Sequence, residues 1–78
     1  MHMTYKTLAS KIDGLRKEQH VSQMELGTLL GITQASVSRK LNGQIPFSVE
    51  EIFECAERFN VSTEYLYGRE KEKTLEPV

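Results

Sequence analysis

The sequence contains little cysteine and proline and no long apolar run, and each of these shortages excludes a class of protein. A single cysteine, Cys55, leaves no internal disulfide among the 78 residues. Two prolines and 38% hydrophobic residues argue against an entirely disordered chain. No apolar run approaches the roughly 20 residues that span a bilayer, and the first residues lack a signal-peptide pattern. We therefore expect one small domain in the reducing cytoplasm, without membrane contact.

Residues that carry chemistry are also scarce. The candidate metal ligands His2, His20 and Cys55 are isolated in the sequence, whereas metal sites need several close thiols or imidazoles. No Ser/His/Asp or Cys/His set that could converge into a catalytic site is visible, and so short a chain has little room for a deep pocket. We therefore expect no enzyme activity and no bound metal or cofactor.

The charge is distributed unevenly, although the net charge is only -1. Residues 1–49 carry six basic against three acidic residues, whereas residues 50–78 carry four basic against eight acidic residues. A basic half suggests a polyanionic partner, but a difference of a few charges is also common on solvated helix faces.

Apolar spacing and capping residues predict an all-α chain of five short helices. Tyr5, Leu8, Ile12 and Leu15 form an apolar stripe for the first helix. The later helices begin at Ser22 and Ser48, which form capping boxes with Glu25 and Glu51, and at the N-caps Thr33 and Ser62. They end at Gly31, Asn42-Gly43, Asn60-Val61 and Gly68. The helices are expected over about residues 4–19, 22–30, 34–41, 48–59 and 62–67.

These helices define a domain over residues 4–68. Residues 1–3 are expected to be a cloning scar or a disordered start, and residues 69–78 a charged flexible tail. The helix over residues 48–59 carries five apolar residues in helical register: Val49, Ile52, Phe53, Ala56 and Phe59. Cys55 is expected on or beside its packed side, as a small apolar residue.

The second and third helices are separated by a tight turn at Gly31, which is the layout of a helix-turn-helix. Gly27 lies inside the second helix, where glycine is unfavourable. A close crossing of the two helices accounts for it, because a larger side chain would push them apart. Ile32 and Val37 are expected to fill the angle between the helices.

The third helix has a polar outer face. If Val37 lies in the core, Thr33 and Leu41 fall on the same side, and a second set falls outward: Gln34, Ala35, Ser38, Arg39 and Asn42. Glutamine side chains pair with adenine, arginine side chains with guanine, and an alanine can contact a thymine methyl. No acidic residue occurs between Glu25 and Glu50, so this segment presents no carboxylate to a DNA backbone.

Residues 23–43 read QMELGTLLGITQASVSRKLNG and are followed by the turn Asn60-Val61-Ser62 and the ending Tyr65-Leu66-Tyr67-Gly68. This combination resembles the lambda-repressor-like (Xre-type) helix-turn-helix family of phages and bacteria. The resemblance implies a compact five-helix domain that binds double-stranded DNA. The DNA would be an inverted-repeat operator, bound by a homodimer that regulates transcription, here as a repressor.

The resemblance and the polar outer face of the third helix together predict which residues contact DNA and a second subunit. Base contacts are assigned to Gln34, Ala35, Ser38 and Arg39. Phosphate contacts are assigned to Ser22, Gln23, Thr33, Ser36, Lys40, Asn42 and Gln44. The dimer interface is assigned to Tyr65, Leu66 and Tyr67, because three bulky residues on a one-turn helix exceed what one side can bury.

Two alternatives remain open at this level. The family usually has an apolar residue where this chain has Lys40, so either Leu41 fills the core or the Lys40 stem does while its amine reaches a phosphate. The second alternative concerns function: an antitoxin or phage accessory protein shares this fold while its main partner is another protein. An acidic face would then serve that partner: Glu50, Glu51, Glu54 and Glu57.

Overall fold

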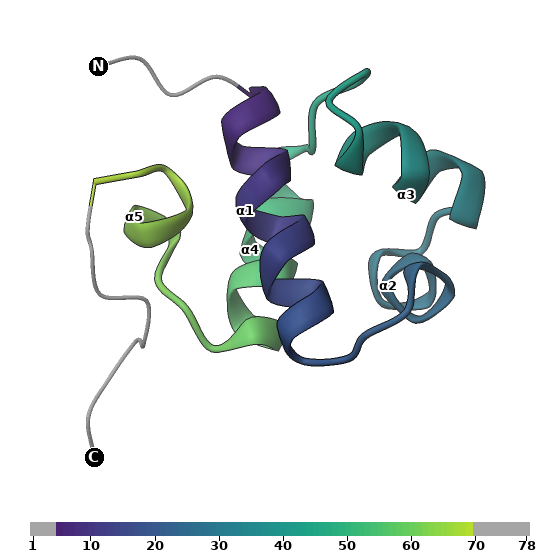
Figure 1. Ribbon diagram of the computed structural model, residues 1–78, viewed down its shortest axis with the longest axis horizontal. Helices are drawn as coiled ribbons and strands as arrows, with labels where there is room; N and C mark the ends of the chain where they lie inside the picture. The colour runs from purple at the N-terminus through teal and green to yellow at the C-terminus, as the bar shows by residue number, and fades with distance from the viewer. Residues whose placement is uncertain (1–4, 70–78) are drawn as a thin grey trace.

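The computed structural model describes residues 5–69 and contains five helices in this part of the chain (Figure 1). They are α1 Tyr5–Glu18, α2 Gln23–Leu30, α3 Gln34–Leu41, α4 Val49–Phe59 and α5 Thr63–Leu66. The predicted all-α, five-helix organisation is therefore confirmed, with helix ends within a residue or two of those expected. The segment 1–3 and all but the first residue of the predicted tail lie outside the described residues.

Each of the last four helices begins at a capping side chain. The hydroxyls of Ser22, Thr33, Ser48 and Ser62 each accept a hydrogen bond from the backbone amide three residues later. Both predicted capping boxes are complete, which satisfies amides that a helix leaves without an internal partner. Gly31, with φ 72°, and Asn60, with φ 58°, end α2 and α4 in the left-handed conformation that these residue types tolerate best.

One apolar cluster joins the five helices. Its fully enclosed members include Ile12, Leu26, Val37, Phe59 and Leu66, which come from α1, α2, α3, α4 and α5. Burial of such side chains is the main favourable contribution to folding. The cluster is continuous, so the position of each helix depends on the others.

The helix α4 buries only part of its predicted apolar register. Ile52, Ala56 and Phe59 are buried, whereas Val49 and Phe53 are 63% and 61% exposed. Successive residues on a helix lie about 100° apart, so Phe53 lies well off the direction of Ile52. The side of α4 that bears Val49 and Phe53 is therefore left largely uncovered by the other helices of residues 5–69.

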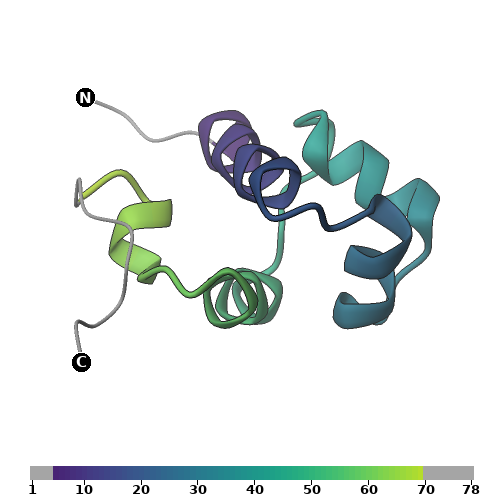
Figure 2. The same cartoon turned by 60° about the horizontal axis from the view of Figure 1, so that its bottom comes forward.

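The helices α1 and α4 lie in the middle of the molecule, between the α2–α3 pair and α5 (Figures 1 and 2). Two side chains near the end of α1 connect these parts. Arg16 donates to the Val21 carbonyl at 2.9 Å, just before α2, and Gln19 donates to the Phe59 carbonyl at 3.1 Å, at the end of α4. The first bond joins α1 to the link before α2, and the second joins the end of α1 to the end of α4.

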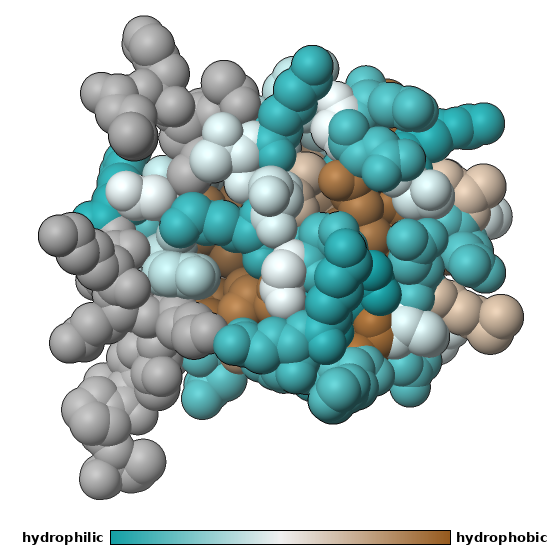
Figure 3. All heavy atoms as spheres, viewed as in Figure 1, coloured by the Kyte–Doolittle hydropathy of each residue, from teal (hydrophilic) through white to brown (hydrophobic). Residues whose placement is uncertain are grey.

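Hydrophilic side chains cover most of the face in which α1 runs down the centre of the molecule (Figure 3). Apolar side chains show there mainly in the recesses between them. Among residues 5–69, no helix combines the length and the apolar character that crossing a bilayer requires.

Candidate nucleic-acid interface

A close approach of backbone at Gly27 sets how α2 meets α3. A Cβ atom added at Gly27 would lie 2.8 Å from the Ile32 carbonyl oxygen and 3.4 Å from Cγ2 of Val37. The Ile32 amide donates to the Gly27 carbonyl at 2.9 Å, which ties the turn to the end of α2. The prediction that Gly27 permits a close crossing is confirmed, and a side chain at this position would collide with backbone.

The core side of α3 matches one of the two alternatives left open by the sequence. Val37 is fully enclosed and Leu41 is buried, while Ile32 packs against the cluster from the turn. Leu41 therefore fills the core, and the Lys40 side chain beside it is also largely covered, at 13% exposed. This settles the roll of α3 about its axis and directs the opposite side of the helix to solvent.

Lys40 forms a partly buried ion pair with α4. Its Nζ lies 2.7 Å from Oε1 of Glu51 and donates to the Pro46 carbonyl at 3.4 Å. Burial opposes the charged form of Glu51, but the hydrogen bonds from Lys40 and the Ser48 amide outweigh burial and lower the Glu51 pKa. A phosphate contact by Lys40, as predicted, would require its amine to leave Glu51.

The outer side of α3 carries the residues predicted to contact bases. Gln34, Ala35 and Arg39 are exposed and Ser38 is half-buried. No hydrogen bond or ion pair with another of the residues 5–69 engages the side chains of Gln34 or Arg39. Their amide and guanidinium groups therefore point to solvent, where they are available for an external partner.

The residues predicted to contact phosphate differ in how far their side chains are already engaged. Ser22 accepts from the Glu25 amide at 3.0 Å, and Thr33 accepts from the Ser36 amide at 3.1 Å and bonds the Ser36 hydroxyl at 3.0 Å. Gln23 is half-buried in the first turn of α2, where backbone amides favour an anion. A second group, Asn42 and Gln44, is exposed just beyond α3.

Glu25 is the acidic residue that lies closest in sequence to these groups. Its Oε1 accepts from the Ser22 amide at 2.7 Å, and this hydrogen bond lowers the pKa of Glu25. The carboxylate is therefore committed to the cap of α2. Its negative charge nevertheless adjoins Gln23, which reduces the attraction of this helix end for a phosphate.

Lys6 is a candidate that the sequence reasoning missed. Its side chain packs on Gly43, where an added Cβ would lie 2.8 Å from the Lys6 Cγ, and Gly43 has φ 77°. The side chain of this exposed lysine therefore begins against the loop after α3, at the residue between Asn42 and Gln44. The excess of basic residues in residues 1–49 could have pointed to Lys6. Its place beside Gly43 could not be read from the sequence, because 37 positions separate the two residues.

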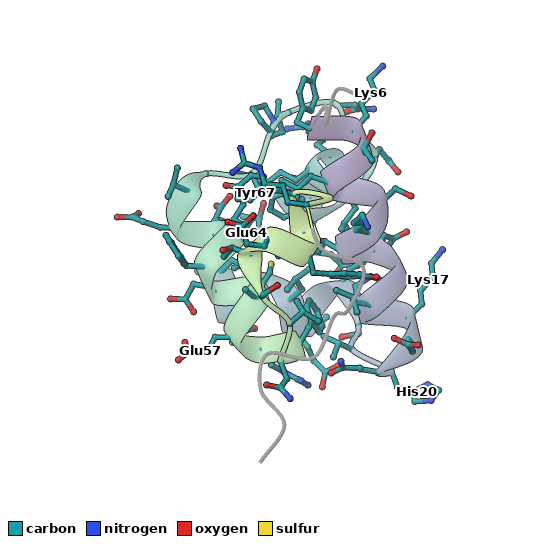
Figure 4. All side chains as sticks on the ribbon, turned by 90° about the vertical axis from the view of Figure 1, so that its left-hand side faces the viewer. Lys6, Lys17, His20, Glu57, Glu64 and Tyr67 are labelled. Carbon is teal, nitrogen blue, oxygen red and sulfur yellow. The ribbon has the colours of Figure 1, made fainter. Side chains whose placement is uncertain are left out.

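The three residues predicted to form a dimer interface have different environments. Leu66 is fully enclosed in the core and exposes no surface, so a dimer interface here would have to form without its side chain. Tyr65 is half-buried, with Lys11 Nζ 4.3 Å from its ring centre. Tyr67 is exposed and lies on the α5 side (Figure 4). Only part of the predicted patch is therefore open.

Cys55 lies on the packed side of α4, as predicted. Burial raises the pKa of its thiol to about 12, and the charges of Glu51 and Glu54 add to the effect. The thiol is therefore protonated at neutral pH and a poor nucleophile. Within residues 5–69, no three His, Cys, Asp or Glu side chains are grouped as metal ligands would be.

Two short helices, a three-residue turn that begins at a left-handed glycine and a polar outer side on the second helix together match a helix-turn-helix domain. The chain belongs to the BetR domain family, whose model matches residues 2–78. The comparison with solved structures found no significant match.

A curated relative also matches. The chain is 35% identical over 71 residues to antitoxin PezA of Streptococcus pneumoniae serotype 4 (strain ATCC BAA-334 / TIGR4). The match covers 91% of this chain and 44% of PezA, so the chain spans less than half the length of this curated relative.

Proposed function

We propose that this chain is a sequence-specific DNA-binding transcriptional repressor that inserts α3 into the major groove. The observation that carries the proposal is the outer side of α3, where Gln34, Ala35 and Arg39 are exposed and Ser38 is half-buried. Glutamine and arginine provide the paired donors and acceptors that match adenine and guanine edges. An ordinary solvated helix more often carries glutamate and lysine at such positions.

The surroundings of α3 support the same proposal. The segment between Glu25 and Glu50 contains no carboxylate, and Lys6 adds a positive charge beside the loop after α3. Phosphate contacts supply much of the affinity for DNA and set the protein on the duplex, while base contacts supply specificity. From the set predicted by the sequence, we assign phosphate contacts to Gln23, Asn42 and Gln44. We add Lys6, which the sequence prediction did not include.

The proposal includes a homodimer on an inverted-repeat operator. Two α3 helices related by a two-fold axis would enter successive major grooves about 34 Å apart. Selection of bound duplexes from a random pool, with the whole chain as bait, tests this directly. Enriched sites should be palindromic, with half-sites one helical turn apart. Recovery of no enriched sequence, at low as well as physiological salt, would contradict the proposal.

A second candidate function is that of an antitoxin-type module that sequesters another protein. The name of the relative PezA supports this reading, as does the acidic outer side of α4. That side is smaller than the sequence suggested, because Glu51 is paired with Lys40, which leaves Glu50, Glu54 and Glu57 exposed.

The two candidate functions can coexist in one chain, and two measurements separate them. Co-purification of a stoichiometric protein together with no salt-sensitive DNA affinity would favour the second function alone. An enriched operator with a steep salt dependence would favour the first, since release of counterions from DNA makes such binding salt-dependent.

A further inference from the structure

We propose that the groove between α4 and the start of α5 is a docking site for a protein segment that carries one bulky apolar side chain flanked by lysine or arginine. The groove has a volume of about 420 Å³ and is lined by Phe53, Ala56, Glu57, Val61, Ser62 and Thr63. This surface is separate from the proposed DNA interface, and the proposal does not require DNA binding.

The apolar part of the groove is exposed in a way that the fold itself does not need. Phe53 is 61% exposed, and Val49, one turn earlier on α4, is 63% exposed. Ala56 and Val61 are buried members of the core and form the floor. An exposed phenylalanine over an apolar floor is the kind of feature that anchors a partner side chain, since a few buried apolar contacts dominate most interfaces.

The charge around the groove selects the partner. Glu57 lines the groove one turn after Phe53, and Glu50 lies three residues before Phe53 on the same side of α4. Both carboxylates are exposed, and no ion pair with another of the described residues neutralises either one. Basic residues on the incoming segment would complement them, which raises the association rate and excludes acidic segments.

Two basic residues near the groove, Arg58 on α4 and Arg69 beyond the end of α5, interact with other groups. Arg58 donates to the side-chain oxygen of Gln19 at 3.4 Å, and Arg69 lies 3.9 Å from Glu64. Figure 4 faces this side of the molecule, with Glu57 on the outer side of α4, Glu64 on α5 and Tyr67 directly after α5. The α2–α3 pair lies on the far side of α1 and α4 (Figure 1), so a segment in the groove leaves α3 open.

A displayed library of random peptides, selected against the whole chain, tests the proposal. Enriched peptides should combine a bulky apolar residue with flanking lysine or arginine. Affinity should fall about tenfold or more for Phe53→Ala, which removes the apolar anchor, and about threefold for Glu57→Gln at low salt. Met24→Ala is the matched control, because Met24 is 66% exposed on α2, and it should bind as the unchanged chain does.

Chemical-shift mapping with an enriched peptide supplies a second readout. The largest amide shifts should fall on the groove residues, and circular dichroism should show that each variant retains its helices. Three results would each overturn the proposal. The selection could enrich acidic peptides, the enriched peptides could bind Phe53→Ala as well as the unchanged chain, or the amide shifts could be centred on α3. A change in the monomer–dimer equilibrium on Phe53→Ala would also overturn it, since a second copy would then occupy the groove. Failure to select a DNA operator would contradict the proposed DNA binding but would leave this peptide-binding proposal unaffected.

Discussion

Gly27 shows how a single missing side chain sets the geometry of a functional element. Its position inside α2 is unfavourable for helix formation, yet an added Cβ would lie 2.8 Å from a backbone oxygen of the turn. Backbone cannot move aside as the end of a flexible side chain can. The close crossing of α2 and α3 therefore depends on glycine here.

Substitution of two helical glycines should have opposite effects on stability. Gly27→Ala should lower the free energy of unfolding by about 1–3 kcal/mol, because the collision with the Ile32 carbonyl outweighs the gain in helix propensity. Gly14→Ala, with nothing within 4 Å of the added Cβ, should raise it by about 0.5–1 kcal/mol. Urea unfolding measures both. Equal effects of the two substitutions would show that Gly27 is not needed for the crossing.

Two glutamines distinguish base recognition from phosphate binding. Gln34→Ala should cost about 1–3 kcal/mol of binding free energy on the selected operator and relax the preference at one base position. Gln23→Ala should weaken binding to all sequences alike, since phosphates carry no sequence information. Titration of both variants against the operator and single-base variants of it separates the two effects. Loss of preference with Gln23→Ala would reverse these roles.

At the scale of elements, α3 and α4 are joined through the pair of Lys40 and Glu51. The same Glu51 oxygen accepts from the Ser48 amide at 2.9 Å and from Lys40 at 2.7 Å. The cap of α4 is therefore also the attachment point of α3. The loop between the two helices is held at both ends by this one carboxylate.

The lowered pKa of Glu51 predicts how this attachment depends on pH. A carboxyl whose pKa falls on folding stabilises the protein above its ordinary pKa of 4.5, and this contribution is lost as the pH falls through the lowered value. Glu51→Gln retains a cap acceptor but loses the charge pair, so it should destabilise the chain by about 1 kcal/mol at pH 7. The difference should vanish in acid. Urea unfolding at pH 7 and in acid tests this. Glu50→Gln, at an exposed position in the first turn of the same helix, is the control. A difference that persists in acid would contradict the proposed cause.

At the scale of the whole molecule, the helices are arranged so that the two proposed interfaces lie at opposite ends. The α2–α3 pair lies on one side of α1 and α4, and α5 lies on the other (Figures 1 and 2). The exposed Tyr67 belongs to the α5 end, so self-association there would leave both α3 helices free for DNA. This arrangement is the one that an inverted-repeat operator requires.

Removal of Tyr67 tests the proposed dimer. Tyr67→Ala should weaken self-association about tenfold, because a bulky aromatic side chain at an interface contributes more than most of its neighbours. The control Met24→Ala truncates an exposed apolar residue at the α2–α3 end and should leave self-association unchanged. Sedimentation equilibrium measures both. A chain that remains monomeric at every concentration would contradict the dimer itself.

The sequence alone determined the five helices, their caps and the need for glycine at position 27, because these depend on hydrogen bonds and spacings within a few residues. It also located the polar side of α3, since one buried residue, Val37, sets the direction of the others on the helix. The contacts that these polar residues make with DNA remain predictions.

Only the tertiary structure decided which charges and apolar side chains remain open. Lys40 is paired with Glu51, eleven residues away, and Lys6 packs on Gly43. Leu66 enters the core while Tyr67 does not, and Phe53 is left exposed beside a groove. None of this follows from local periodicity, because burial and pairing depend on which element of the fold lies opposite each residue.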